Sequence, residues 1–277
     1  MRSGRTGFAG PVMPAGAALS LLLLSGCAGL ASRPGVFDAS HREIVVAGRT
    51  YHATYVTPAA SASPKPFVAF FTGDAGWMGT SGMLFSHLAE SGYPLAGFDS
   101  REALKPIKKS GEAVSVSEAA DGIEEAIARA KSDLGLEAAT PVLVIGFSRG
   151  ASLVAFTAVH PRLHAGLAGA VAVALTRETD YLKAPDPVDR PPEIQVDEKG
   201  RMQLYPALAL IGAIPLAVIQ STGDRYVPSA ESRRLLGPDT PTRRLYEIEA
   251  RNHGFSGADE ALLGALDDAL RWIGPKP

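Results

Sequence analysis

A serine in this chain has the surroundings that nucleophilic catalysis requires. Ser148 stands in Gly146-Phe147-Ser148-Arg149-Gly150, a G-x-S-x-G pattern that follows the apolar run 142–145 and precedes a small-residue helix pattern. In this strand–turn–helix context the pattern predicts a nucleophile elbow, a strained turn that exposes the serine hydroxyl at the carboxyl edge of a sheet. Because the bare pentapeptide occurs by chance in about one chain in ten of this size, the interpretation depends on partners elsewhere in the chain.

An aspartate and a histidine further along the chain supply those partners. A serine hydroxyl becomes a good nucleophile when a neighbouring base takes its proton and a carboxylate orients that base. Asp224 follows the predicted strand 215–220 within a Gly-Asp-x-x-Val-Pro segment. His253 follows the last predicted strand, 244–248, and Gly254 lets the loop turn back over the sheet. The chain order of serine, acid and histidine is that of the α/β hydrolases.

Asp224 and His253 could also have structural roles in place of catalytic ones. Asp224 could cap a helix that begins at Ser229, and His253 could be a solvated or core histidine. Asp180 follows the preceding strand and is the second candidate for the acid, although it lacks the Gly-Asp-x-x-Val-Pro surroundings.

The remaining site residues are predicted from the loops beside the serine. An oxyanion hole needs two backbone donors, and we expect the amides of Arg149 and Asp74, with Ala75 as the alternative to Asp74. Trp77 and Phe147 are candidates to line the acyl pocket, or else they pack in the core. The chain has no H-E-x-x-H, P-loop or G-x-G-x-x-G pattern, so we expect no metal and no organic cofactor.

Alternating strand and helix patterns position these residues. They predict a mostly parallel, doubly wound α/β sheet with an antiparallel N-terminal hairpin. Pro, Asp and Lys are frequent in the segment of about 181–205, which we interpret as a cap or lid. The predicted strands are 43–46, 51–56, 67–71, 94–98, 142–145, 167–175, 215–220 and 244–248; the clearest predicted helices are 81–91, one that begins at a Ser115/Glu118 capping box, and 256–273.

Composition and the N-terminus indicate where such a protein would act. With 46% hydrophobic residues and a formal net charge of −2, the 277-residue chain is globular and gives no electrostatic case for a nucleic-acid partner. Arg2 and Arg5 precede the apolar run 17–24, which ends in Leu24-Ser25-Gly26-Cys27, similar to the lipobox of bacterial lipoproteins. The single cysteine, Cys27, excludes an intrachain disulfide.

We therefore expect a lipoprotein signal peptide (1–26), a tether (27–40) and an α/β-hydrolase domain (41–277). Lipidation at Cys27 would anchor the protein to a membrane and make it face the periplasm, and Ala28 after it favours the outer membrane. A conventional cleaved signal and an uncleaved anchor are the alternatives.

Three motifs in order give a resemblance to a family. With Gly73-Asp74-Ala75-Gly76-Trp77, Gly97-Phe98-Asp99-Ser100 and the elbow followed by Ala151, the stretch from about 66 to 275 resembles the bacterial VirJ/AcvB virulence-protein family. This resemblance implies an envelope α/β hydrolase with a serine nucleophile. For AcvB-like members it further implies hydrolysis of the aminoacyl ester of lysyl-phosphatidylglycerol. The chain departs from the family pattern after Ser100 and at Ser152.

The sequence thus predicts an envelope serine hydrolase whose substrate is a carboxylic ester, with an aminoacyl-phosphatidylglycerol as one candidate. Arg101, Lys105, Lys108 and Lys109 could meet the phosphate of an anionic membrane lipid, or form a solvated surface. A non-catalytic docking factor on the same fold is the competing class, and an amide or thioester substrate would suit the same three side chains.

Overall fold

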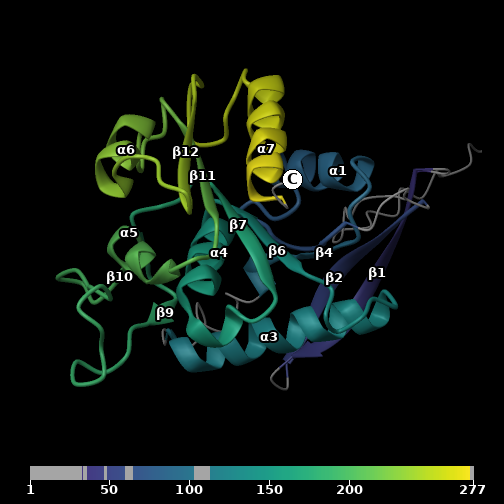
Figure 1. Cartoon of the computed structure of the whole chain (residues 1–277), viewed down its shortest axis with the longest axis horizontal. Coiled ribbons are helices and arrows are strands. Elements are labelled where there is room, and N and C mark those ends of the chain that lie inside the picture. The colour runs from purple at the N-terminus through teal and green to yellow at the C-terminus, as the bar shows by residue number, and fades with distance from the viewer. Residues whose placement is uncertain (1–32, 34–35, 47–48, 60–64, 103–112, 275–277) are drawn as a thin grey trace, which may run out of the picture.

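An eight-stranded sheet forms the centre of the computed structural model, which describes residues 33, 36–46, 49–59, 65–102 and 113–274 (Figure 1). Strand β2 pairs antiparallel with both of its neighbours, β1 and β4, and every other pair of neighbouring strands in this sheet is parallel. In spatial order the strands are β1 (Phe37–Val46), β2 (Arg49–Pro58), β4 (Leu95–Phe98), β3 (Phe67–Phe71), β6 (Val142–Phe147), β7 (Leu167–Val173), β11 (Leu216–Ser221) and β12 (Arg243–Ile248). The predicted fold class, a mostly parallel sheet with an antiparallel hairpin at one edge, is confirmed.

The central strands are continuous apolar runs because helices cover both faces of the sheet. Every residue of β3, β6 and β11 is buried. Helices α3 (Val116–Asp133), α4 (Arg149–Val159) and α6 (Ser229–Leu236) pack into one hydrophobic cluster. Helices α1 (Thr80–Glu90) and α7 (Asp259–Ile273) pack into another on the opposite face (Figure 1). Because the strands from β4 to β12 in the spatial order are parallel, their carboxyl ends lie at one edge of the sheet.

The predicted capping box at the start of α3 is present. The Glu118 amide donates to the Ser115 hydroxyl at 3.2 Å, and the Ser115 amide donates to the Glu118 carboxylate at 3.1 Å. These reciprocal bonds satisfy donors that a helix start leaves unpaired. They mark Ser115 as the residue at which the helix begins.

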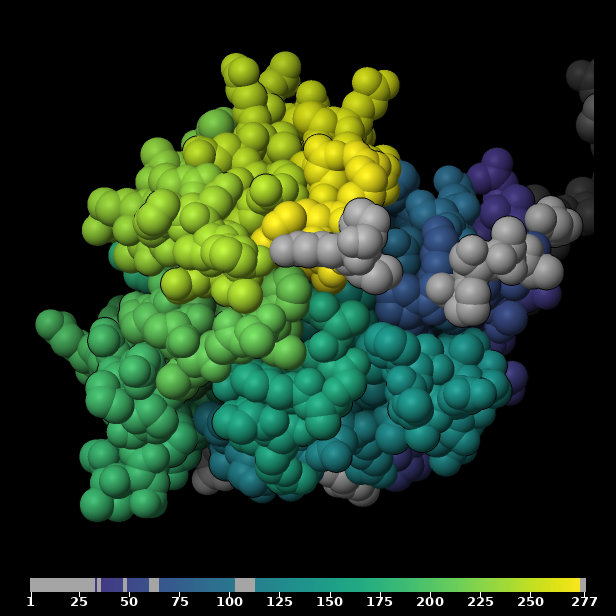
Figure 2. Space-filling model, in the orientation of Figure 1, coloured from purple at the N-terminus to yellow at the C-terminus, as the bar shows by residue number. Residues whose placement is uncertain are grey.

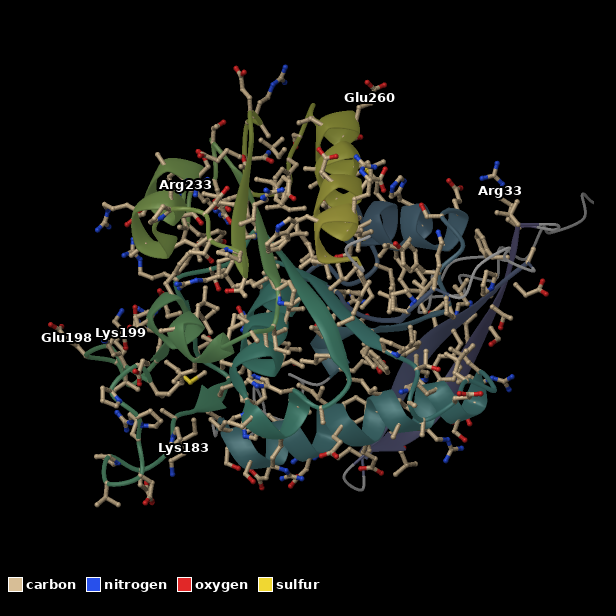
Figure 3. The ribbon with its side chains drawn as sticks, in the orientation of Figure 1. Arg33, Lys183, Glu198, Lys199, Arg233 and Glu260 are labelled. Atoms are coloured by element: carbon tan, nitrogen blue, oxygen red, sulfur yellow. The ribbon has the colours of Figure 1, made fainter. Side chains whose placement is uncertain are left out.

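The segment predicted as a cap is held at both ends and extends outward between them. Strand β9 (Leu182–Lys183) pairs with β5 (Val114–Ser115), and β10 (Met202–Gln203) pairs with β8 (Glu178–Thr179) ahead of the short helix α5 (Leu204–Ala207). Figure 2 shows the segment projecting at the lower left, and the labelled side chains of Lys183, Glu198 and Lys199 lie at its outer margin in Figure 3.

The first strand is longer than expected. β1 begins at Phe37, so residues 37–40, placed in the tether by the sequence, belong to the sheet. Phe37 is 4% exposed and packs beside β2, which explains why pairing extends to it. Cys27 and the predicted signal peptide lie outside the described residues. Among the helices that the structure describes, none is long and apolar enough to cross a membrane.

Candidate active site

Ser148 lies at the sharp turn between β6 and α4. Its backbone adopts φ 55° and ψ −115°, a left-handed conformation that costs free energy for a residue with a Cβ. A Cβ on Gly146 would lie 2.4 Å from the Gly150 carbonyl oxygen, and one on Gly150 would lie 2.1 Å from the carbonyl oxygen of Phe71. Only glycine therefore fits on either side of the serine, and the predicted nucleophile elbow is present.

The structure brings together the three side chains that the sequence singles out. His253 Nε2 lies 2.7 Å from Ser148 Oγ, and His253 Nδ1 lies 2.7 Å from Asp224 Oδ2. They come from the ends of β6, β11 and β12, which end at the same edge of the sheet. Because a carboxylate only accepts hydrogen bonds, Nδ1 donates to Asp224, which leaves Nε2 able to accept the serine proton.

Asp224 is buried, and both of its oxygens are fully occupied. The residue is 1% exposed. Oδ2 also accepts from Gln220 Nε2 at 2.9 Å, while Oδ1 accepts from the amides of Tyr226 at 2.8 Å and Val227 at 3.4 Å. Four donors thus hold one carboxylate, which fixes its orientation toward the imidazole.

Two aromatic rings flank the imidazole. The ring of Tyr226 stands edge-on to His253 with 4.9 Å between centroids, and the ring of Phe147 lies 5.6 Å away. The His253 side chain is 17% exposed. These contacts restrict its rotation, so the chain of hydrogen bonds to Ser148 is pre-organised.

Backbone donors are available where the oxyanion hole is predicted. Arg149 is the first residue of α4, so its amide has no acceptor within the helix and lies at the positive end of the helix dipole. In the 73–77 loop, the Gly76 amide donates to the Gly73 carbonyl at 3.0 Å, and the Gly73 amide donates to Ser81 Oγ at 3.1 Å. Asp74 and Ala75 of this tight turn line the same cleft as Ser148.

The side chains of Arg149, Asp74 and Asp180 form a charge clamp that the sequence did not indicate. Arg149 Nε donates to Asp74 Oδ1 at 2.5 Å, and Nη1 donates to Asp180 Oδ1 at 2.8 Å. Burial alone would lower the pKa of Arg149, but the hydrogen bonds and charges of the two carboxylates outweigh it and raise that pKa. Asp180, the second candidate for the catalytic acid, is thus bound to the arginine, and Asp224 is the acid that meets His253.

Ser148 and His253 open into a cleft of about 730 Å³. Phe147 lines it, as predicted. Trp77 does not: its ring packs 4.9 Å from that of Phe85 and 6.4 Å from that of Phe70, within the cluster beneath α1. The loop turns the indole down onto Gly97, where a Cβ would lie 2.2 Å from it, so Trp77 is a packing residue.

The predicted cap contributes only its two ends to this cleft. Tyr181 and Arg201 line the wall, and no described residue between them does. Arg101, from the predicted basic cluster, is bound by Asp99, which accepts from its Nε at 3.0 and 3.1 Å. The lysines of that cluster lie outside the described residues. Among the described residues, no three His, Cys, Asp or Glu side chains gather as a metal site would require.

Sequence reasoning missed Gln220, which donates a hydrogen bond to Asp224, and Tyr226, whose ring packs against His253. Both lie within four residues of Asp224, so the signal was local: a buried glutamine at the end of an apolar strand needs a partner. The Arg149 clamp had no such signal, since its members lie 31 and 75 residues apart.

Comparisons with known proteins agree with the topology. No family model matches the chain, and no curated protein matches it in sequence. The chain is similar in structure to a candidate dienelactone hydrolase from Klebsiella pneumoniae, with a TM-score of 0.60, 17% identity, and 86% of this chain and 98% of that one covered. It is similar to the esterase Pf2001 from Pyrococcus furiosus, with a TM-score of 0.58, 15% identity and coverage of 86% and 94%.

A third similar structure is XC6422 from Xanthomonas campestris, described as an α/β serine hydrolase without a lid, with a TM-score of 0.55, 16% identity and coverage of 86% and 97%. These likenesses concern the fold and do not single out the VirJ/AcvB family. By its strand order and by these neighbours, the chain has the α/β-hydrolase fold.

Proposed function

We propose that this protein is a serine hydrolase that cleaves a carboxylic ester by acyl transfer to Ser148. The observation that carries the proposal is the continuous hydrogen-bond chain from Ser148 through His253 to Asp224, with both links at 2.7 Å. A hydroxyl so placed, at a strained turn and against an oriented imidazole, is an activated nucleophile.

The geometry supports a two-stage reaction. His253 Nε2 takes the Ser148 proton as the oxygen attacks the ester carbonyl, and then gives that proton to the departing alcohol. Water attacks the acyl-enzyme in the second stage, with His253 again acting as base. The amides of Arg149 and Asp74 are the donors that we assign to the oxyanion, a role that contributes about 10²–10³ in kcat per donor.

A fluorophosphonate probe tests this proposal. Wild-type protein should be labelled stoichiometrically and should hydrolyse p-nitrophenyl acetate, and Ser148→Ala should lose both properties. Ser132→Ala, an exposed serine on α3, is the matched control and should keep both. An inert wild type would refute the enzyme and favour the docking factor.

For the natural substrate we propose an ester of an anionic membrane lipid, with the aminoacyl ester of an aminoacyl-phosphatidylglycerol as the first candidate. The family resemblance supports it, and so does Arg225 on the cleft wall. Its guanidinium lies 4.8 Å from the Tyr226 ring and donates to the Tyr226 hydroxyl at 2.7 Å, with no carboxylate partner among the described residues. A cation on the cleft wall without such a partner suits a lipid phosphate.

Charge reversal distinguishes this substrate from a neutral one. Arg225→Glu should lower the hydrolysis of lysyl-phosphatidylglycerol in vesicles and spare p-nitrophenyl acetate. Arg244→Glu is the matched control, since Arg244 also lies over aromatic rings, at 5.3 Å from Trp272, but outside the cleft. Equal losses on both substrates would count against the anionic lipid.

We also propose that the protein is a lipoprotein of the bacterial envelope that faces the periplasm, anchored through Cys27. The sequence Leu24-Ser25-Gly26-Cys27 supports this. Cells fed labelled palmitate should label the wild type and not Cys27→Ala, which should leave the membrane fraction. Retention of the label by that variant would overturn the assignment.

A further inference from the structure

A second cavity lies at the carboxyl edge of the sheet, next to the catalytic cleft. Its volume is about 250 Å³, and it lies between α3 and the ends of β3 and β4. Phe71 and Phe98, the last residues of those strands, form its floor, and the β1–β2 hairpin closes the far side through Val46 and Tyr51. Nothing in the catalytic geometry accounts for this space.

The cavity exists because α3 presents its smallest residues there. Ala119, Gly122 and Ala126 line it at helical spacings of three and four, so they share one face of the helix. A Cβ added to Gly122 would lie 3.5 Å from Val46 Cγ1, an ordinary contact distance, so a larger side chain would fit but would enter the cavity.

The walls suit an uncharged, apolar occupant. Aliphatic and aromatic side chains form most of the lining. Of its described charged residues, Asp99 is bound by Arg101, and Arg149 by Asp74 and Asp180. The other two, Arg49 and Glu118, are exposed. Among the described lining atoms, Ser100 Oγ is the one that is both buried and without a hydrogen-bond partner, and a single hydroxyl does not call for an ion.

The cavity and the cleft share a wall made by Arg149 and Tyr181. The Tyr181 hydroxyl donates to the Arg149 carbonyl at 2.9 Å, and the Arg149 guanidinium lies 5.5 Å from the Tyr181 ring. Asp74 and Asp180 hold that guanidinium from the cleft side, which leaves its aliphatic stem between the two spaces. The cavity and the cleft are therefore adjacent across these two side chains.

We propose that this cavity binds a linear alkyl chain of the ester substrate, and that Gly122 determines how long that chain can be. The inference rests on the proposed ester hydrolysis and names its substrate class. Each methylene that moves from water into the cavity should raise kcat/KM by about fourfold until the cavity is full.

Gly122→Leu tests the proposal, with Gly264→Leu as the matched control. Gly264 is an exposed residue within α7 with no atom within 4 Å of a Cβ built on it, so both changes alter helix propensity equally. In the wild type, kcat/KM should rise with length either for p-nitrophenyl esters from acetate to octanoate or for alkyl acetates from ethyl to octyl. Gly122→Leu should remove the rise while keeping acetate hydrolysis, and Gly264→Leu should match the wild type.

Octyl acetate compared with ethyl octanoate then shows whether the chain belongs to the alcohol or to the acyl group, because only one should depend on Gly122. Flat length profiles in the wild type for both series, with p-nitrophenyl acetate still hydrolysed, would overturn the cavity proposal and leave the proposed function standing. So would a Gly122→Leu protein that loses acetate and octanoate activity equally.

A binding measurement keeps the inference testable without turnover. Calorimetry with Ser148→Ala should detect ethyl octanoate or octyl acetate, and the added Gly122→Leu change should weaken that binding by at least about tenfold, as expected for the exclusion of two or more methylenes. Ala119→Leu, with Ala261→Leu on the exposed side of α7 as its control, provides a second pair should Gly122→Leu fail to fold. No binding by Ser148→Ala would refute the proposal.

Discussion

Replacing Asp224 by asparagine should stop catalysis although it changes neither size nor shape. One carboxylate oxygen accepts from the backbone amides of Tyr226 and Val227, which cannot rotate. The asparagine oxygen must therefore take that position, and its NH₂ group must take the position of Oδ2. There it meets two groups that are donors in the native protein, Gln220 Nε2 and His253 Nδ1.

Each of these two donor–donor contacts can be relieved only by turning the neighbouring side chain or by moving its proton. Turning the Gln220 amide would give up its bond to the Val227 carbonyl, 2.6 Å from Nε2, and such a loss in a buried site costs about 1–3 kcal/mol of stability. His253 can accept at Nδ1 only by carrying its proton on Nε2. That proton then points at Ser148 Oγ, 2.7 Å away, where a base is needed. The variant folds with the wrong tautomer.

The expected loss in kcat is about 10³–10⁴-fold, which corresponds to about 4–5.5 kcal/mol of transition-state stabilisation. Steady-state hydrolysis of p-nitrophenyl acetate and the rate of fluorophosphonate labelling should fall together. Asp180→Asn is the control, because Asp180 binds Arg149 and not the histidine. Its kcat should stay within about threefold of that of the wild type, because the Asp180 side chain is 63% exposed and an exposed ion pair contributes little. An Asp224→Asn protein within tenfold of wild-type activity would refute this account of the base.

Three further predictions concern stability. Gly79→Ala should lower the free energy of unfolding in urea by about 1–2 kcal/mol, because φ is +60° there. Gly76→Ala, at φ +61°, should lower it by about 1 kcal/mol more, since its Cβ would lie 2.3 Å from the Arg101 guanidinium. Equal losses in the two variants would contradict that contact. Trp77→Ala should lower the free energy of unfolding by about 3 kcal/mol, because it removes a ring from the core. It should leave the chain-length preference for esters unchanged. A shifted preference in a stably folded variant would show that the indole lines the cleft. Burial, and then the charge of a neighbouring aspartate, raise the pKa of Tyr55 to about 12, so the unfolded chain loses that proton first, near pH 10. Stability should be complete below pH 10 and decline by up to about 1.4 kcal/mol per pH unit from there to pH 12, and in Tyr55→Phe the decline should be shallower; parallel curves would show that the phenol does not contribute.

Local sequence signals were sufficient for the elements and for the reactive side chains. Runs of apolar residues predicted the central strands β3, β4, β6, β7 and β11, because strands covered on both faces need side chains without polar groups. The glycines around Ser148 predicted the elbow, since no larger residue fits there. Asp224 and His253 were identifiable because each follows a strand that ends at the same edge of the sheet.

Other features depend on contacts between residues that are distant in the chain, and no short pattern encodes those. Trp77 has the same neighbours in sequence whether it faces the cleft or the core; the packing of α1 against β3 and β4 decides in favour of the core. In the same way, the sequence left Asp180 open as a catalytic acid, and only the folded chain places Arg149 against it.

The sequence alone determined which groups could react and which strand ends would carry them, because burial and backbone sterics act on each segment where it stands. The tertiary structure alone decided which charges pair, which aromatic ring lines the cleft and where α3 leaves a cavity, because those outcomes depend on how whole helices pack on the sheet.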